Sequence, residues 1–161
     1  MAAPESDTRV PADEPIIAFT RLLDAPRALV WQVWTDPAHI ARWWGPTGFR
    51  ITNHAMAVTP GGIWDFAMHG PDGRDYDNRI TYHEVVPPAR LVYSHGEPGD
   101  TEQFHVTVTF AEEGRGRTRL VMLARFPSLA ARDHVVREVG AVEGGQQTLD
   151  RLADYLARHP F

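Results

Sequence analysis

Hydrophobic and polar residues alternate along much of the chain between residues 15 and 126, a pattern that predicts β-strands. The clearest case is residues 104–110, where every second residue is apolar and those between are histidine or threonine. The strand connections are short and contain no crossover helix, which favours antiparallel pairing. Seven strands are predicted, at residues 15–23, 49–59, 63–69, 76–86, 90–95, 104–110 and 118–126.

Helical spacing of apolar residues occurs in two regions. Residues 28–35 read as an amphipathic helix, and a second short helix is predicted to begin at Asp36-Pro37, because aspartate is a good N-cap and proline suits the first helical position. A long helix is predicted from about residue 130 to residue 159, ended by Pro160. Its apolar stripe is Val135, Val139, Val142, Gln146, Leu149, Ala153 and Leu156.

These elements predict an α+β fold. A seven-stranded antiparallel sheet wraps around a long C-terminal helix, and two short helices follow the first strand. Residues 15–161 are expected to form a single domain. Residues 1–14 have no hydrophobic stretch typical of a signal peptide, and we expect them to be a disordered leader.

Composition restricts the function classes. The net charge of −5 and the pI of about 5.9 argue against nucleic acid as a partner. The absence of cysteine excludes disulfides, thiol nucleophiles and cysteine-ligated zinc, and it suits a cytoplasmic location. No apolar run approaches the roughly 20 residues that span a bilayer, so no membrane insertion is expected. Monomer and homodimer both remain open.

The motifs of catalysis and metal binding are absent. None of the eight histidines belongs to an HxH or HExxH motif, and there is no phosphate-binding loop and no Gly-x-Ser-x-Gly turn. We therefore predict no metal and no cofactor. A carboxylate–imidazole pair such as Asp65 and His69 could still perform acid–base chemistry. That enzyme hypothesis requires Asp65, His69, His83 or His105 to point into an interior cavity.

A curved sheet around one helix leaves space that side chains do not fill. The predicted helix also has glycines, which lack side chains, near its middle. Gly144 and Gly145 indicate either close approach of another group or deliberate absence of a side chain. Gln146 lies on the apolar stripe, where its amide needs a partner or a ligand. The alternative is that the glycine pair kinks the helix and Gln146 bonds to the sheet.

Four groups of residues resemble one known family. They are VWQVWTDP with RWWGP (30–37 and 42–46), PGGxWxFxMxGPDG (60–73), YxEVVPPxRLV (82–92) and TLDRLAxYL (148–156). In this order they resemble the bacterial proteins that are homologous to the C-terminal domain of the activator of the Hsp90 ATPase, AHSA1-like members of the SRPBCC superfamily. The resemblance covers about residues 16–157. Where relatives often carry tryptophan, this chain has Gly145, which is expected to enlarge the cavity.

The resemblance implies a helix-grip fold like that of START and Bet v 1 domains. It also implies non-catalytic binding of an apolar small molecule or lipid between the sheet and the C-terminal helix, and a stress-related role. One alternative is a co-chaperone that binds Hsp90, although such activators normally also have an N-terminal domain that this sequence does not include. The other is a cyclase- or hydrolase-like enzyme that uses the same cavity. Twelve side chains are predicted to line the cavity or orient its ligand: Trp34, Trp43, Trp64, Phe66, Met68, Asn78, Tyr82, Val106, Met122, Val139, Val142 and Gln146.

Overall fold

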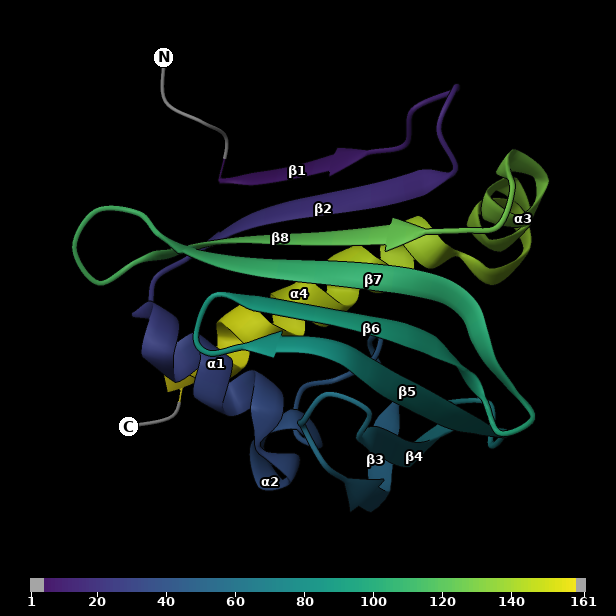
Figure 1. Ribbon diagram of the computed structural model, residues 1–161, viewed down its shortest axis with the longest axis horizontal. Coiled ribbons are helices and arrows are strands. Elements are labelled where there is room, and N and C mark those ends of the chain that lie inside the picture. The colour runs from purple at the N-terminus through teal and green to yellow at the C-terminus, as the bar shows by residue number, and fades with distance from the viewer. Residues whose placement is uncertain (1–4, 159–161) are drawn as a thin grey trace.

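The computed structural model describes residues 5–158, which form an eight-stranded antiparallel sheet with helix α4 lying across one face (Figure 1). The strand order in the sheet is β1-β2-β8-β7-β6-β5-β4-β3. The predicted helix-grip class is confirmed, with one strand more than predicted. The strands are β1 (Ser6–Arg9), β2 (Ile16–Leu23), β3 (Arg50–Met56), β4 (Ile63–His69), β5 (Asp75–Val86), β6 (Arg90–Glu97), β7 (Asp100–Glu112) and β8 (Thr118–Arg125).

The two short helices after β2 are α1 (Arg27–Thr35) and α2 (Pro37–Ile40). The Asp36 carboxylate accepts a hydrogen bond from the Ala38 amide at 2.8 Å, which is the N-cap predicted from the Asp-Pro pair. Both helices lie beside the end of α4 in Figure 1. They deliver the tryptophan-rich segment to one end of the curved sheet.

The eighth strand, β1, lies in the segment expected to be a disordered leader. Ser6 pairs with Arg21 and Arg9 pairs with Ala18, so β1 extends the sheet beyond β2. The sequence of β1 is polar, and it carries no hydrophobic alternation, because backbone hydrogen bonds rather than core packing hold this edge strand. The leader prediction is therefore wrong for residues 6–9, and for residues 1–4 it lies outside the described residues.

The C-terminal helical region is divided at Gly140, not at the Gly144-Gly145 pair. Helix α3 (Leu129–His134) passes into a π-helical turn, η1 (Val135–Val139), and α4 (Ala141–Arg158) begins after the break. Gly140 has φ +69°, a left-handed conformation that ends η1 and that glycine adopts without steric cost. The predicted end of the helix at Pro160 lies outside the described residues.

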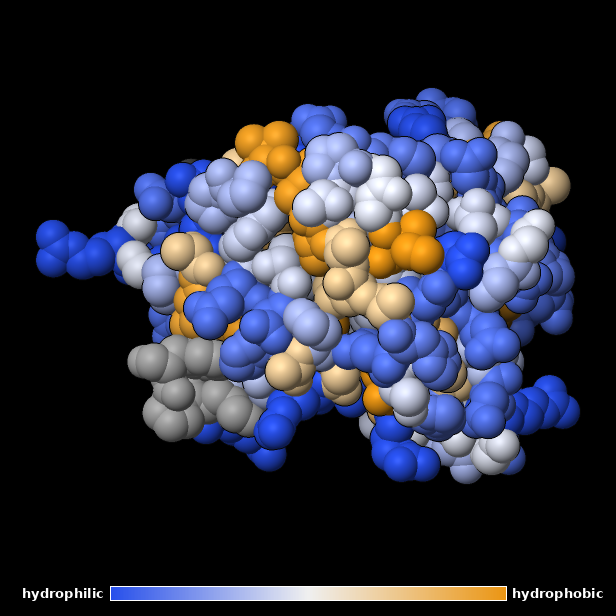
Figure 2. Space-filling model, turned by 60° about the horizontal axis from the view of Figure 1, so that its bottom comes forward, coloured by the Kyte–Doolittle hydropathy of each residue, from blue (hydrophilic) through white to orange (hydrophobic). Residues whose placement is uncertain are grey.

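Bulges in β3, β5 and β6 bend the sheet around α4. The concave side holds the core, which continues into the tryptophan cluster of α1 and α2. Trp43 is fully buried, its ring lies 5.0 Å from that of Trp34, and its indole N–H donates to the Val33 carbonyl at 3.1 Å. On the face shown in Figure 2, hydrophilic side chains predominate and hydrophobic ones gather only in small patches.

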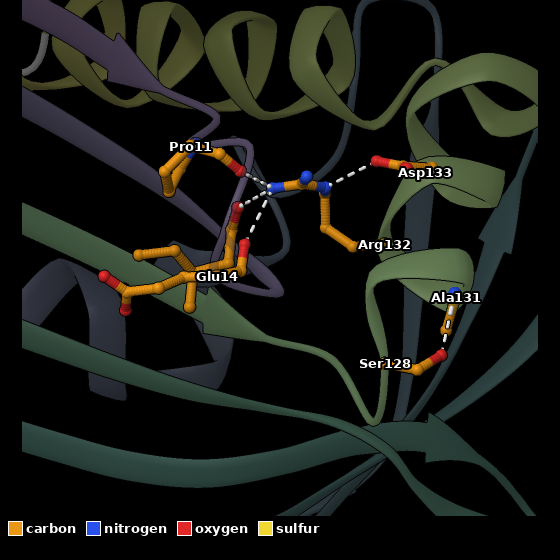
Figure 3. Close-up of polar contacts among 7 residues, drawn as sticks. Pro11, Glu14, Ser128, Ala131, Arg132 and Asp133 are labelled. Carbon is orange, nitrogen blue, oxygen red and sulfur yellow. Dashed lines mark hydrogen bonds and ion pairs between the residues drawn. The ribbon is translucent and has the colours of Figure 1, made fainter.

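A buried arginine ties α3 to the start of β2. The Nη1 of Arg132 donates to the backbone carbonyls of Pro11, Glu14 and Ile16 at 2.8–3.0 Å (Figure 3). Its Nε donates to the Asp133 carboxylate at 2.8 Å, and only 3% of Arg132 is exposed. This one side chain fixes both the loop before β2 and the helix that precedes the break at Gly140.

Candidate functional site

An apolar pocket of about 240 Å³ lies between the sheet and the start of α4. At about 30 Å³ for each water, this is room for roughly eight water molecules, or for one small ring system. Strands β2, β6, β7 and β8 form its floor, and η1 with α4 forms its roof. Its lining includes Ile17, Phe19, Trp44, Gly45, Pro46, Met68, Tyr93, His95, Phe104, Val106, Met122, Ala124, Phe126, Val139, Gly140, Ala141, Gly144, Gly145 and Thr148.

Trp44 forms the wall of the pocket next to the tryptophan cluster. Its ring lies edge-on to Trp64 at 5.2 Å and tilted against His95 at 6.4 Å. The wall is held by Arg151 of α4, whose Nη1 donates to the carbonyls of Trp44, Gly45 and Pro46 at 2.8–3.1 Å. Burial lowers the pKa of Arg151. Arg151, part of the TLDRLA motif, thereby fixes the loop that closes one end of the pocket.

The glycine pair of α4 allows the helix backbone to approach the sheet. A Cβ atom at Gly145 would lie only 2.2 Å from the Phe19 ring of β2. A Cβ atom at Gly144 would instead make an ordinary 3.4 Å contact with Pro46. Close packing against Phe19 therefore explains Gly145. The Phe19 ring occupies the space beside Gly145 by which the cavity was expected to be enlarged.

Replacing Gly145 by alanine is expected to lower the free energy of unfolding by about 1–2 kcal/mol, because the clash with buried Phe19 outweighs the gain in helix propensity. The matched control is Gly144→Ala, which is expected to leave stability unchanged or raise it by up to about 1 kcal/mol. Urea unfolding of both variants measures the difference. Equal effects at the two positions would contradict the proposed packing.

Two polar groups that line the pocket have no hydrogen-bond partner among the described residues. They are the Tyr93 hydroxyl and the Trp44 indole N–H, and the two side chains are only 1% and 7% exposed. Burial, with a smaller effect of Tyr82, raises the pKa of Tyr93, so its hydroxyl stays protonated. Within residues 5–158 the one fully buried side-chain nitrogen or oxygen without a partner is Arg21 Nε. The Tyr93 and Trp44 donors are therefore not sealed in the core, and they are available to a ligand in the pocket that they line.

A third polar group, the imidazole of His95, is oriented by Asn78. The Asn78 Nδ2 donates to the Tyr76 carbonyl at 3.1 Å, which places Oδ1 toward His95 Nε2 at 2.9 Å. His95 Nε2 must then carry the proton, and Nδ1 is left as an acceptor. Burial lowers the pKa of His95 to about 4, so the ring is neutral at pH 7. The pocket thus offers two donors and one acceptor within an apolar lining.

This burial makes stability depend on pH. Because the pKa of His95 is about 4 in the folded protein and 6.5 without burial, the unfolded chain binds a proton first as the pH falls. The contribution of neutral His95 is complete above about pH 6.5 and is lost progressively toward pH 4. Urea unfolding at several pH values is expected to show a smaller loss of stability in His95→Gln than in the wild type. Identical pH profiles would contradict this prediction, and His54→Gln, an exposed position, serves as the control.

A wider groove of about 710 Å³ adjoins the pocket and shares Pro46, Met68 and Val139 with it. The groove lies between α4 with η1 on one side and β4, β5 and β6 on the other. It also shares Gly140 and Gly144 with the pocket, and its further lining includes Phe49, Tyr76, Asp77, Asn78, Gly96, Glu97, Gln103, Glu138, Glu143 and Gln147.

The twelve predicted site residues divide into several groups. Met68, Val106, Met122 and Val139 line the pocket. Asn78 lines the adjoining groove and reaches the pocket only through His95. The others belong to the core around the pocket without lining it: Trp34, Trp43, Trp64, Phe66, Tyr82 and Val142.

Gln146 lies on the other side of α4 from the predicted position. Its Nε2 donates to the Thr8 hydroxyl of β1 at 3.0 Å, which is the alternative in which this amide bonds to the sheet. The break at Gly140 changes the helical phase, so Val139 and Gln146 do not continue one stripe, and Val139 is 68% exposed. Sequence reasoning missed Tyr93 and His95, although the alternation of Leu91, Tyr93 and His95 would have placed them on the inner face.

The four residues required by the enzyme hypothesis do not line the pocket. Asp65 forms an ion pair with Arg79, and His69 contacts Thr52 and Asp75. His83 and His105 flank Ser94 on the opposite face of the sheet. Within residues 5–158, no three His, Asp or Glu side chains are close enough together to hold a metal ion.

The sheet, the terminal helix and the pocket between them define a helix-grip domain. A family model described as "Activator of Hsp90 ATPase homolog 1-like protein" matches residues 24–157, and the chain belongs to this family. Among curated proteins, no relative matches. None of the described helices is long and apolar enough to cross a membrane.

Solved structures with the same fold cover nearly the whole chain. Protein Ms6760 of Mycobacterium smegmatis is 26% identical, with a TM-score of 0.86 over 97% of this chain and 100% of its own. A protein of Rhodobacter sphaeroides is 25% identical, with a TM-score of 0.82 over 97% of this chain and 100% of its own. The AHSA1 protein of Silicibacter pomeroyi shares the fold at 23% identity, with a TM-score of 0.71 over 88% and 97% of the two chains.

Proposed function

We propose that the protein binds an apolar small molecule in the pocket between the sheet and α4. The observation that carries this proposal is an apolar lining together with two donors, on the largely buried Tyr93 and Trp44 side chains, that have no partner among the described residues. Burial of ligand surface would provide the driving force, at about 25 cal/mol for each Å² before the costs of association. Tyr93, Trp44 and His95 would orient one polar group of the ligand, as is typical of such sites.

The role we propose is binding rather than catalysis, because the neutral His95 is held by Asn78 and no carboxylate of the described residues lines the inner pocket. A co-chaperone role would instead place function on the outer surface. ATPase stimulation of Hsp90 tests that alternative separately.

Titration calorimetry with naphthol, a small neutral ring system with one hydroxyl, tests the proposal. Wild-type protein is expected to bind it, and Ala124→Phe is expected to abolish binding because the new ring fills the pocket beneath α4. Ala111→Phe, at an exposed position on β7, is the control that should retain binding. Val106→Phe is a second filling variant in case Ala124→Phe does not fold. Equal binding by filled and unfilled proteins would refute the pocket as the site.

A further inference from the structure

The groove outside the pocket is acidic on both of its sides. Four carboxylates line it: Asp77 of β5, Glu97 of β6, Glu138 of η1 and Glu143 of α4. In the part of the chain that the structure describes, no arginine or histidine lines the groove. Carboxylates gathered in this way repel one another and attract a cation.

These four carboxylates are not neutralised by the protein. Several acidic groups elsewhere in the described chain have arginine partners, as in Asp65 with Arg79 and Glu113 with Arg119. Asp77, Glu97, Glu138 and Glu143 form no ion pair or hydrogen bond with any residue from 5 to 158 through their side chains. The charge of the groove therefore remains available to a molecule that enters it.

Aromatic and apolar side chains lie among the carboxylates. The Phe49 and Tyr76 rings are 6.2 Å apart, and Tyr76 is 42% exposed. Val139, 68% exposed, marks the passage from the groove to the inner pocket. Aromatic faces beside carboxylates are suited to an organic ammonium group. A bare metal ion is not favoured, because within the described chain no three acidic or histidine side chains converge.

The inner pocket supplies the second, independent observation. The side chains of Tyr93 and Trp44 are more than nine-tenths buried, line the pocket and have no partner for their polar hydrogens within residues 5–158. The pocket and the groove share Pro46, Met68 and Val139, so a ligand long enough to occupy both would keep one end in the acidic groove. The inner pocket therefore favours an apolar group and the groove a positively charged group, and one ligand could carry both.

We propose that the ligand is an amphipathic organic cation, with its apolar body in the inner pocket and an amine or quaternary ammonium group in the acidic groove. This inference rests on the proposed function and specifies its ligand class.

Three probes of equal length separate the inference from the proposed function: phenylbutylamine, phenylbutanol and phenylbutanoate. Calorimetry at low salt is expected to show the amine binding about tenfold more tightly than the alcohol, and the carboxylate binding most weakly. High salt should reduce the preference for the amine without affecting the alcohol.

The double variant Glu138→Gln/Glu143→Gln is expected to lose most of the preference for the amine while binding the alcohol as before. Asp24→Asn, an exposed carboxylate that does not line the groove, should change nothing. Equal affinities for amine and alcohol in the wild type would overturn the inference and leave pocket binding intact. No binding of any of the three probes, together with no binding of naphthol, would refute both.

Discussion

Replacing Trp43 by alanine is expected to lower the free energy of unfolding by about 3–5 kcal/mol, the largest single effect we predict. Trp43 is fully buried, and its ring lies 5.0 Å from that of Trp34 and 5.7 Å from that of Trp44. Alanine would leave a cavity between α1 and α2 and an unpaired Val33 carbonyl. Urea unfolding followed by circular dichroism measures the loss.

Two further variants test whether the buried ring accounts for the loss of stability. Trp43→Phe keeps most of the ring and is expected to cost clearly less than Trp43→Ala. Trp31→Ala removes a tryptophan of helix α1 that is only partly buried, and it should also cost less. A loss for Trp43→Ala no greater than that for Trp31→Ala would contradict the central place of this ring in the core.

The second large effect is expected at Arg132. Arg132→Met should lower the free energy of unfolding by roughly 3 kcal/mol, because the carbonyls of Pro11, Glu14 and Ile16 lose one shared charged donor. The methionine side chain can fill the space of Arg132 but cannot donate hydrogen bonds to these carbonyls. Chemical unfolding gives the magnitude.

Arg158→Met is the matched control for Arg132, since Arg158 is exposed and its one side-chain partner among residues 5–158 is Asp154 on the preceding turn. It should change stability by no more than about 0.5 kcal/mol. Hydrogen exchange gives a more local readout, with faster exchange expected around β2 and α3 in Arg132→Met alone. Similar losses of unfolding free energy in the two variants would contradict the proposal that Arg132 holds α3 against the start of β2.

The sequence predicted the seven main strands and the two short helices because their patterns depend on local chemistry. Alternation in residues 63–69 and the Asp36-Pro37 cap gave elements whose bounds the structure repeats closely. Strand β1 escaped prediction, since backbone pairing with β2 leaves no hydrophobic signature in a polar segment. The break at Gly140 escaped as well, because helical spacing continues on either side of it.

The candidate site was harder to predict, since lining a pocket and filling a core require the same apolar residues. Trp34 and Trp43 were natural candidates, yet Trp44 is the neighbour whose ring reaches the pocket. Gly145 was correctly singled out as unusual, but only the position of Phe19 shows that close packing explains it. The position of the Gln146 amide depends on β1, which the sequence did not reveal.

The most direct test of the account is a crystal structure of the protein with naphthol bound. We expect the ring between Phe126 and the start of α4, with its hydroxyl within hydrogen-bonding distance of Tyr93 or His95. Naphthol found only on the outer surface, with the space beneath α4 closed by side chains, would contradict it.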